Sequence, residues 1–264
     1  MRDVRGSVCR IRRGKNARRD LIRLTATAYF DFLQQLSSLM RDPIAYGRDL
    51  PAGDGRPVLL VPGFTAGDWS LAPMAQWLRR VGYRPYLSGI DFNVGCPRQK
   101  IERLEWRVEK IARETNDRVT IIGHSLGGLL ARATAATRSD QVRHVIGLGS
   151  PIRNGSAGVH DRVRPTLEAI QSFFQTFTRN PENCGTPECA CGFASAGYLP
   201  MPRGTRFSAI YTRSDEVVQW ESCIDERGTS HEVSGLHGSL IVNREVYRII
   251  GTLLGVTSFV TAAA

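Results

Sequence analysis

One serine in this sequence lies in a pattern that could make it a nucleophile. Ser125 is the third residue of G-H-S-L-G-G at 123–128, between a run of strand-forming residues and an alanine-rich stretch. A serine hydroxyl is a weak nucleophile and must be held on a tight turn within reach of a general base. Flanking glycines relieve the crowding of such a turn, and the amino end of a following helix favours developing negative charge. We therefore predict that Ser125 attacks a carbonyl carbon.

An acid and a histidine are expected after the serine, in that order. Asp215 follows a predicted strand at 207–211, and a carboxylate there could orient an imidazole and stabilise its protonated form. Glu216 is adjacent and Asp225 is close, so each is an alternative acid that would otherwise be a surface charge. His237 follows in a glycine-flanked loop beyond the last predicted strand, where the general base is needed.

The other four histidines fit the role of base less well. His124 is next to the nucleophile but is expected to point away from it. His144 and His231 fall on or beside predicted strands, and His160 falls in a long segment between strands. The predicted triad is therefore Ser125, Asp215 and His237.

Acyl transfer also needs hydrogen-bond donors for the oxyanion of the tetrahedral intermediate. The backbone amide of Leu126 directly follows the nucleophile and is one candidate. The amide of Phe64, after Pro62-Gly63 at the end of the first predicted strand, is the other. Each such donor contributes about 3–4 kcal/mol to stabilisation of the transition state. The Phe64 ring could pack in the core at the same time.

The apolar runs of the chain predict the scaffold that positions these groups. Strands are expected at 56–61, 83–86, 119–122, 145–148, 207–211 and 230–233. Helices are expected at 68–80 (capped by Asp68), 98–115, 166–178 and 240–254, with an alanine-rich helix after Ser125. This alternation indicates an α/β protein with a mostly parallel, doubly wound sheet and helices on both faces.

One segment, about 152–205, interrupts the alternation without a clear core strand. It contains the predicted helix at 166–178 and then a loop rich in cysteine, proline and glycine. Long excursions of this kind are commonly functional, and we interpret this one as a cap over the site. The apolar residues largely on one side of its helix are Leu167, Ile170, Phe173, Phe174 and Phe177. They either pack against the core or, facing the nucleophile, line a pocket for apolar esters.

Composition fits one domain at 51–264 behind a basic N-terminal segment at 1–50. The chain has 264 residues, of which 42% are hydrophobic and 23% charged, as in a globular protein. The segment 1–50 holds eleven Lys and Arg against five Asp and Glu, and an amphipathic helix at 17–40. It could contact an anionic membrane peripherally, or be a solvated terminus. No motif indicates a nucleic-acid partner.

No targeting or membrane-spanning segment is recognisable in the sequence. The N-terminus lacks the apolar core of a secretory signal, and the apolar tail at 255–264 is too short to span a bilayer. We therefore expect a cytoplasmic protein. The predicted chemistry requires no cofactor.

Four cysteines could join the cap to the body of the protein. Cys184, Cys189 and Cys191 are crowded together, and Cys223 follows the predicted acid by eight residues. They could hold a structural zinc ion or form one or two disulfides, although the spacing is not the paired C-x2-C of common zinc modules. A cytosolic location favours metal or free thiols, and export favours disulfides.

Four motifs taken together resemble a poorly characterised group of bacterial α/β-hydrolases of the lipase/esterase kind. These motifs are P-G-F at 62–64, G-[HW]-S-L-G-G at 123–128, S-D-x-V-V-x-W-x-x-C at 214–223 and V-S-G-x-H-x-x-x-x-V-N at 233–243. The similarity spans about residues 56–250. Glu216 replaces a glycine of the group and Leu236 a small residue, so the loops around the acid and the base are expected to differ locally.

The resemblance implies an α/β-hydrolase fold with an inserted cap and the triad named above. It also implies hydrolysis of apolar carboxylic esters through an acyl-enzyme, with a small-molecule or lipid ester as substrate. The same triad supports thioesterase, amidase or acyltransferase chemistry. A vestigial triad would instead leave a non-catalytic, membrane-associated binding protein.

Overall fold

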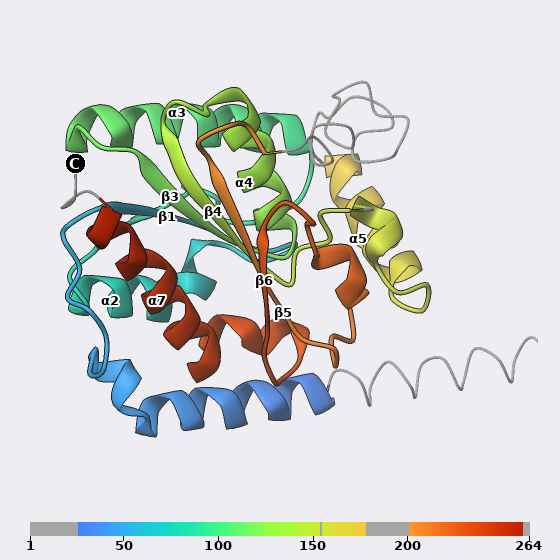
Figure 1. The fold of residues 1–264 in the computed structure, drawn as a ribbon. Helices are drawn as coiled ribbons and strands as arrows, with labels where there is room; N and C mark the ends of the chain where they lie inside the picture. The colour runs from blue at the N-terminus through green and yellow to red at the C-terminus, as the bar shows by residue number, and fades with distance from the viewer. Residues whose placement is uncertain (1–25, 154, 178–200, 261–264) are drawn as a thin grey trace, which may run out of the picture.

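In the computed structural model, which describes residues 26–153, 155–177 and 201–260, the strands form one parallel sheet (Figure 1). Within these ranges the sheet has six strands in the order β2-β1-β3-β4-β5-β6, and every neighbouring pair is parallel. The strands are β1 (Pro57–Val61), β2 (Arg84–Leu87), β3 (Val119–His124), β4 (Val142–Leu148), β5 (Arg206–Tyr211) and β6 (Thr229–Glu232). The predicted parallel α/β architecture is confirmed.

Helices cover both faces of this sheet (Figure 1). On one face lie α2 (Ala72–Arg80) and α7 (Arg244–Val260); on the other lie α3 (Pro97–Thr115) and α4 (Leu126–Thr137). Short 3-10 helices connect the elements: η1 (Pro43–Tyr46), η2 (Asp68–Leu71), η3 (Gly155–Gly158), η4 (Trp220–Cys223) and η5 (His237–Val242). Because β1 and β3 run between two helical layers, their side chains are buried on both sides, which explains their continuous apolar sequence.

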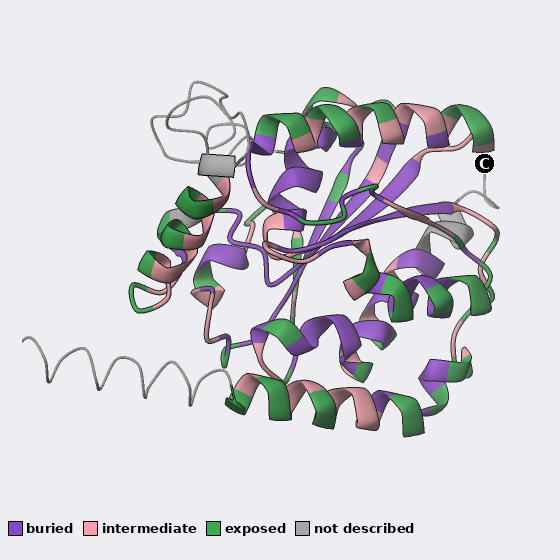
Figure 2. Cartoon of the chain, turned by 180° about the vertical axis from the view of Figure 1, so that it is seen from behind, coloured by how far each residue is buried: buried purple, intermediate pink, exposed green. Residues whose placement is uncertain are grey.

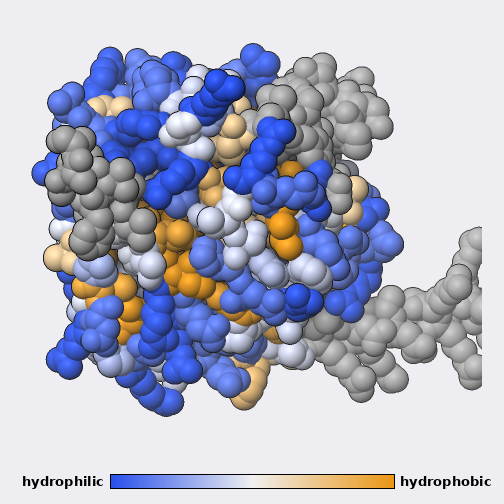
Figure 3. Space-filling model, in the orientation of Figure 1, coloured by the Kyte–Doolittle hydropathy of each residue, from blue (hydrophilic) through white to orange (hydrophobic). Residues whose placement is uncertain are grey.

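A further helix over residues 26–41 lies outside the layer formed by α2 and α7 (Figure 1). Leu39 is its one buried residue among those described, and most of the helix surface is exposed or half-buried (Figure 2). Hydrophilic residues predominate on the face seen in Figure 3, where apolar residues reach the surface mainly at its centre. Across the described ranges, none of the helices combines the length and hydropathy of a transmembrane segment.

The described part of the predicted cap contains η3 and α5 (Arg164–Phe177), which matches the expected helix at 166–178. Gln171 of α5 exchanges hydrogen bonds with the backbone of Gly95, in the loop that follows β2. The helix therefore lies at the carboxyl end of the sheet, where parallel strands direct their functional loops. The rest of the cap, residues 178–200, lies outside the described residues.

Two local predictions are wrong. The Asp68 carboxylate does not cap its helix but accepts hydrogen bonds from Ser88 and from the Gly89 amide, because these groups of the loop after β2 lie within its reach. The terminal helix begins at Arg244 rather than at residue 240, since the buried Asn243 side chain accepts from the Glu245 and Val246 amides and caps it there.

Candidate active site

Ser125 occupies a sharp turn between β3 and α4. Its backbone has φ 53° and ψ −121°, in the left-handed half of conformational space that residues with a Cβ rarely adopt. The Ser125 amide donates to the Leu148 carbonyl at 2.8 Å, which ties the turn to the end of β4. The residue is half-buried, so this strained turn lies at the surface of the protein rather than in its core.

Close backbone contacts explain the two glycines that flank the serine. A Cβ added to Gly123 would overlap the backbone of Gly127. One added to Gly127 would overlap the carbonyl of Val61 at the end of β1. The turn can be this compact only because neither residue has a side chain, and this is the steric reason for the two glycines of G-x-S-x-G.

Asp215 and His237 form a buried hydrogen-bonded pair. The Nδ1–H of His237 donates to Asp215 Oδ2 at 2.7 Å, and the two residues are 6% and 5% exposed. The other carboxylate oxygen of Asp215 accepts from the Val217 and Val218 amides at 2.9 and 2.7 Å. This arrangement fixes the imidazole with Nδ1 protonated and leaves Nε2 to accept a proton.

Neither alternative acid contacts the imidazole of His237 in this way. Asp225 forms an ion pair with Arg132 at 2.7 Å, and both side chains are nearly buried. Glu216 Oε2 accepts from the backbone amide of His237 at 2.9 Å, so it holds the main chain of the base rather than its ring. Sequence reasoning missed this role and treated Glu216 as a local departure from the expected glycine.

Opposing effects set the basicity of His237. Burial disfavours the charged imidazolium, but attraction to Asp215, the hydrogen bond to Asp215 and attraction to Glu216 outweigh it. Together they raise the pKa of His237 above its usual value of 6.5. The site thus stabilises the protonated form that a general base reaches after it has taken a proton.

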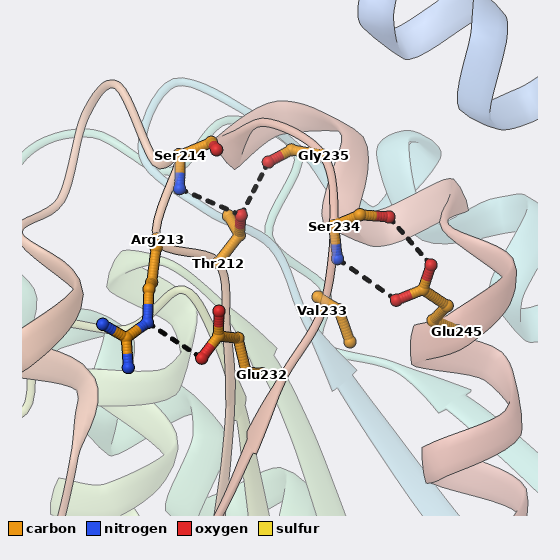
Figure 4. Close-up of a pocket in the computed structure, with 8 residues that line it drawn as sticks. All are labelled: Thr212, Arg213, Ser214, Glu232, Val233, Ser234, Gly235 and Glu245. Carbon is orange, nitrogen blue, oxygen red and sulfur yellow. Dashed lines mark hydrogen bonds and ion pairs between the residues drawn. The ribbon is translucent and has the colours of Figure 1, made fainter.

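The segment that leads to Asp215 and the segment that leads to His237 are joined by hydrogen bonds (Figure 4). The Thr212 hydroxyl donates to the Gly235 carbonyl at 2.8 Å and accepts from the Ser214 amide at 3.2 Å. The charged side chains that line the open pocket at this point are already engaged: Glu232 with Arg213 and Glu245 with Ser234. These contacts therefore hold the two loops that carry Asp215 and His237 in place.

His124 lies beside the base, although sequence reasoning set it aside. Its Nε2–H donates to the carbonyl oxygen of His237 at 3.0 Å, and the two rings are 4.9 Å apart between centroids. Burial, and then repulsion from a protonated His237, lower the pKa of His124 to about 3. It is therefore a neutral donor that holds the backbone of the base.

The remaining histidines occupy other places. His144 is buried and bonds the Ser208 hydroxyl at 2.8 Å near the amino end of β4, away from the carboxyl end where Ser125 lies. His160 donates from Nε2 to the backbone carbonyl of Asp215 at 3.1 Å, so the start of the cap is attached to the acid loop. His231 lies on β6.

The loop that bears Phe64 lies against the nucleophile turn. A Cβ on Gly63 would be 3.3 Å from the Cβ of Ser125, so the two backbones are close neighbours. Asn93 holds this loop: its side chain donates to the Pro62 carbonyl at 2.8 Å, and its backbone bonds both Thr65 and Ala66. The Phe64 amide donates to none of the described residues.

The Leu126 amide is the second predicted donor. Leu126 begins α4, and the first amide of a helix has no acceptor within it. Both predicted oxyanion donors therefore border Ser125 in the fold, one in the turn itself and one across from it.

The overall arrangement is that of known lipases and esterases. Monoglyceride lipase from Saccharomyces cerevisiae superposes with a TM-score of 0.53 at 16% identity, over 78% of this chain and 87% of the lipase. A Bacillus licheniformis lipase gives 0.52 at 14% identity, covering 79% and 96%, and a carboxylesterase structure from Nitrososphaera gargenis gives 0.52 at 15%, covering 80% and 94%. The chain has the α/β-hydrolase fold.

Comparison at the sequence level adds one match. Residues 99–186 of this chain match the model of the PGAP1-like alpha/beta domain, a stretch that includes the Ser125 turn. No curated protein matches the chain. The α/β-hydrolase fold implied by the motifs therefore agrees with the structural comparison.

Aromatic side chains lie near the carboxyl edge of the sheet. Phe174 of α5 packs edge-on against Phe92 with 5.1 Å between ring centroids, and against Phe173 at 5.4 Å. Phe92 and Phe173 are exposed, as is Trp69 just beyond the loop of Phe64. Of the predicted stripe on α5, Leu167 and Ile170 are half-buried, and the side chain of Phe177 lies outside the described set.

The cysteine cluster is only partly described. Cys223 is a buried free thiol in η4, and burial raises its pKa. Cys184, Cys189 and Cys191 lie outside the described residues, so the zinc or disulfide cross-link stays a prediction. Among the described residues, no group of three or more His, Cys, Asp or Glu side chains could hold a metal ion.

Proposed function

We propose that this protein is a serine hydrolase that cleaves carboxylic esters through Ser125, Asp215 and His237. The observation that carries the proposal is the buried Asp215–His237 pair at 2.7 Å in a fold that sets Ser125 on a left-handed turn. A buried carboxylate–imidazole pair and a strained serine at the carboxyl edge of one sheet suit nucleophilic catalysis.

The mechanism begins with a neutral His237. Its Nε2 accepts the proton of Ser125 while the serine Oγ attacks the ester carbonyl carbon, and the carbonyl π electrons move onto oxygen. The amides of Phe64 and Leu126 stabilise this oxyanion. Asp215 stabilises the imidazolium throughout.

Collapse of the tetrahedral intermediate breaks the bond to the alcohol oxygen, which takes the proton from His237 and leaves. An acyl-enzyme on Ser125 remains. Water then gives a proton to His237 and attacks the acyl carbon, and the second intermediate releases the carboxylic acid and regenerates the Ser125 hydroxyl. No step requires a cofactor.

Apolar esters are the proposed substrates. The exposed aromatic side chains of Trp69, Phe92 and Phe173 border the oxyanion loop and α5, and apolar walls of this kind suit acyl or aryl groups. The names of the structural neighbours, monoglyceride lipase and carboxylesterase, support the same class. Thioesterase, amidase and acyltransferase reactions use the same groups and differ in leaving group or acceptor. A cytoplasmic location stays a prediction of the sequence.

One labelling experiment separates catalysis from a vestigial triad. A fluorophosphonate probe should label the wild-type protein on Ser125, and Ser125→Ala should abolish both labelling and hydrolysis of a short p-nitrophenyl ester. Labelling at another residue, or survival of most activity in the variant, would refute the assignment. Matched thioester, amide and alcohol-acceptor assays then rank the four reactions, and a parallel chelator arm tests the cysteine cluster.

A further inference from the structure

The helix over residues 26–41 exposes a row of apolar side chains. The exposed fractions are 66% for Tyr29, 69% for Phe30, 44% for Leu33 and 56% for Met40. Tyr29, Leu33 and Met40 are separated by four and seven residues, so they lie along one side of the helix, and Phe30 borders them. An exposed apolar row of this extent marks an interaction surface.

A different side of the same helix attaches it to the protein. Leu39 is buried in the core formed with α2 and α7, and Phe32 and Leu36 pack against that core. The side chains of the exposed row are therefore additional to those that hold the helix in place. Folding of the domain does not explain them, whereas contact with an apolar environment outside the protein does.

Positive charge flanks this row. Residues 1–25, which lead directly into the helix, contain nine Lys and Arg against two Asp and Glu. At the other end Arg41 and Arg48 are exposed beside the exposed Asp49, and the buried Asp42 is paired with Arg248. Within the described helix Asp31 is the one acidic residue, and its carboxylate accepts a hydrogen bond from the Leu236 amide.

An apolar helical face that follows a strongly basic segment fits the surface of an anionic bilayer. Lys and Arg are attracted to acidic headgroups, while aromatic and aliphatic side chains enter the boundary between headgroups and acyl chains. We propose that the face of helix 26–41 bearing Tyr29, Phe30, Leu33 and Met40 docks on an anionic lipid bilayer, with residues 1–25 adding charge attraction.

The docking helix also contacts the loop of the catalytic base. Asp31 Oδ2 accepts from the Leu236 amide at 3.0 Å, and Leu236 directly precedes His237. Gln35, one turn further along the helix, is close to Gly235 of the same loop. A Cβ added to Gly235 would be 3.1 Å from the side-chain amide nitrogen of Gln35. Asp31 and Gln35 lie on the side of the helix away from the docking row, so the helix that would meet the bilayer holds the active-site loop from its other side. The consequence that lipid esters reach Ser125 from the bilayer rests on the proposed function; the docking itself does not.

Vesicle flotation of the full chain tests the docking. Wild-type protein should float with vesicles of phosphatidylglycerol and phosphatidylcholine, at least tenfold more than with pure phosphatidylcholine, and salt should weaken the binding. Replacing two exposed residues, Phe30→Ser with Leu33→Ser, should lower the partition coefficient at least tenfold. Trp106→Ser is the matched control, because Trp106 is 54% exposed on α3, on the other face of the sheet.

Three flotation results would overturn the proposal: wild-type protein that floats with neither vesicle, a double variant that floats like wild type, or a control that loses as much binding. If this face instead joins two copies of the chain, sedimentation velocity would show a dimer that the double variant does not form, and the protein would not float with vesicles. That result would also overturn the proposal. A second pair, Tyr29→Ser with Met40→Ser, gives an independent test should the first pair melt early. Ser125→Ala should float like wild type, so failure of the proposed esterase activity and failure of docking are read separately.

Discussion

The side chain of His124 donates a hydrogen bond to the backbone carbonyl of His237 at 3.0 Å, so the residue before the nucleophile holds the residue that activates it. The carbonyl acceptor requires the proton of His124 to be on Nε2. Since the pKa of His124 is about 3, the ring stays neutral at working pH and keeps this role unchanged. The turn of Ser125 and the loop of His237 are thereby linked by one contact.

Removing this link should slow the reaction more than it weakens substrate binding. His124→Ala leaves a carbonyl without its donor, which costs about 1–3 kcal/mol where the group stays desolvated. We expect kcat to fall by roughly tenfold or more, because about 1.4 kcal/mol corresponds to a factor of ten, with a smaller change in KM. Steady-state kinetics on a soluble ester measures both.

Variants that keep a donor provide the control. The resembling motif accepts histidine or tryptophan at this position, and both carry a ring N–H. His124→Trp and His124→Gln should therefore recover part of the lost kcat, which a simple packing defect would not predict. Equal loss in all three variants would contradict the role of the hydrogen bond.

The charge of Glu216 should contribute to the pH dependence of the base, after the larger effect of Asp215. His237 acts only when neutral, so kcat/KM should rise with pH through the pKa of His237, which the structure raises above 6.5. Glu216→Gln removes one of the attractions that raise this pKa but keeps an oxygen that can accept from the His237 amide. The acidic limb of the profile should therefore move to lower pH.

A remote carboxylate gives the comparison for this shift. Glu232 is paired with Arg213 at 2.9 Å and is not among the groups that perturb His237. Glu232→Gln should leave the acidic limb in place. A limb that is unmoved in Glu216→Gln would show that Glu216 acts only through backbone geometry. An equal shift in both variants would show a general effect of net charge rather than a specific role of Glu216.

Glycine at position 127 should be required for stability as well as for activity. The added Cβ of Gly127→Ala would overlap the Val61 carbonyl, and backbone at the sheet centre cannot move away cheaply. Overpacking of this kind costs about 1–3 kcal/mol. Each kcal/mol lowers Tm by roughly 2–4 °C in a domain of this size, so thermal unfolding reports the effect.

Gly238 is the matched control for this substitution. It is next to His237, yet a Cβ there would meet no atom within 4 Å. Gly238→Ala should change Tm and ester hydrolysis little. Similar melting of the two variants would mean that the Ser125 turn tolerates expansion that the geometry forbids.

The sequence predicts the fold and the triad because their signals are local. Apolar runs such as β1 identify buried strands, and the glycines around Ser125 report a turn that only they permit. The supporting contacts depend on residues far apart in the chain. His124 meets His237 across 113 positions and Asp31 meets Leu236 across 205, and nothing in either neighbourhood indicates the partner.

The choice of acid shows the same limit at short range. Asp215 and Glu216 are adjacent carboxylates after one strand, and no local pattern decides which of them reaches the imidazole. The loop after β5 decides it: the Val217 and Val218 amides hold one oxygen of Asp215 and direct the other at His237. Glu216, one residue on, reaches only the backbone of the base.

Phe173 should influence the choice among ester substrates. It is 59% exposed on α5, beside Phe174 and the Phe92 loop at the carboxyl edge of the sheet. If acyl chains lie against this surface, Phe173→Ala removes apolar contact that long chains use and acetate does not. We expect kcat/KM for p-nitrophenyl octanoate, relative to acetate, to fall by roughly tenfold, the scale of a lost apolar contact in a binding pocket. Adding Phe177→Ala should lower this ratio further. The control Trp106→Ala, on α3, should leave the ratio unchanged. An unaltered ratio in the α5 variants would show that the acyl chain binds elsewhere.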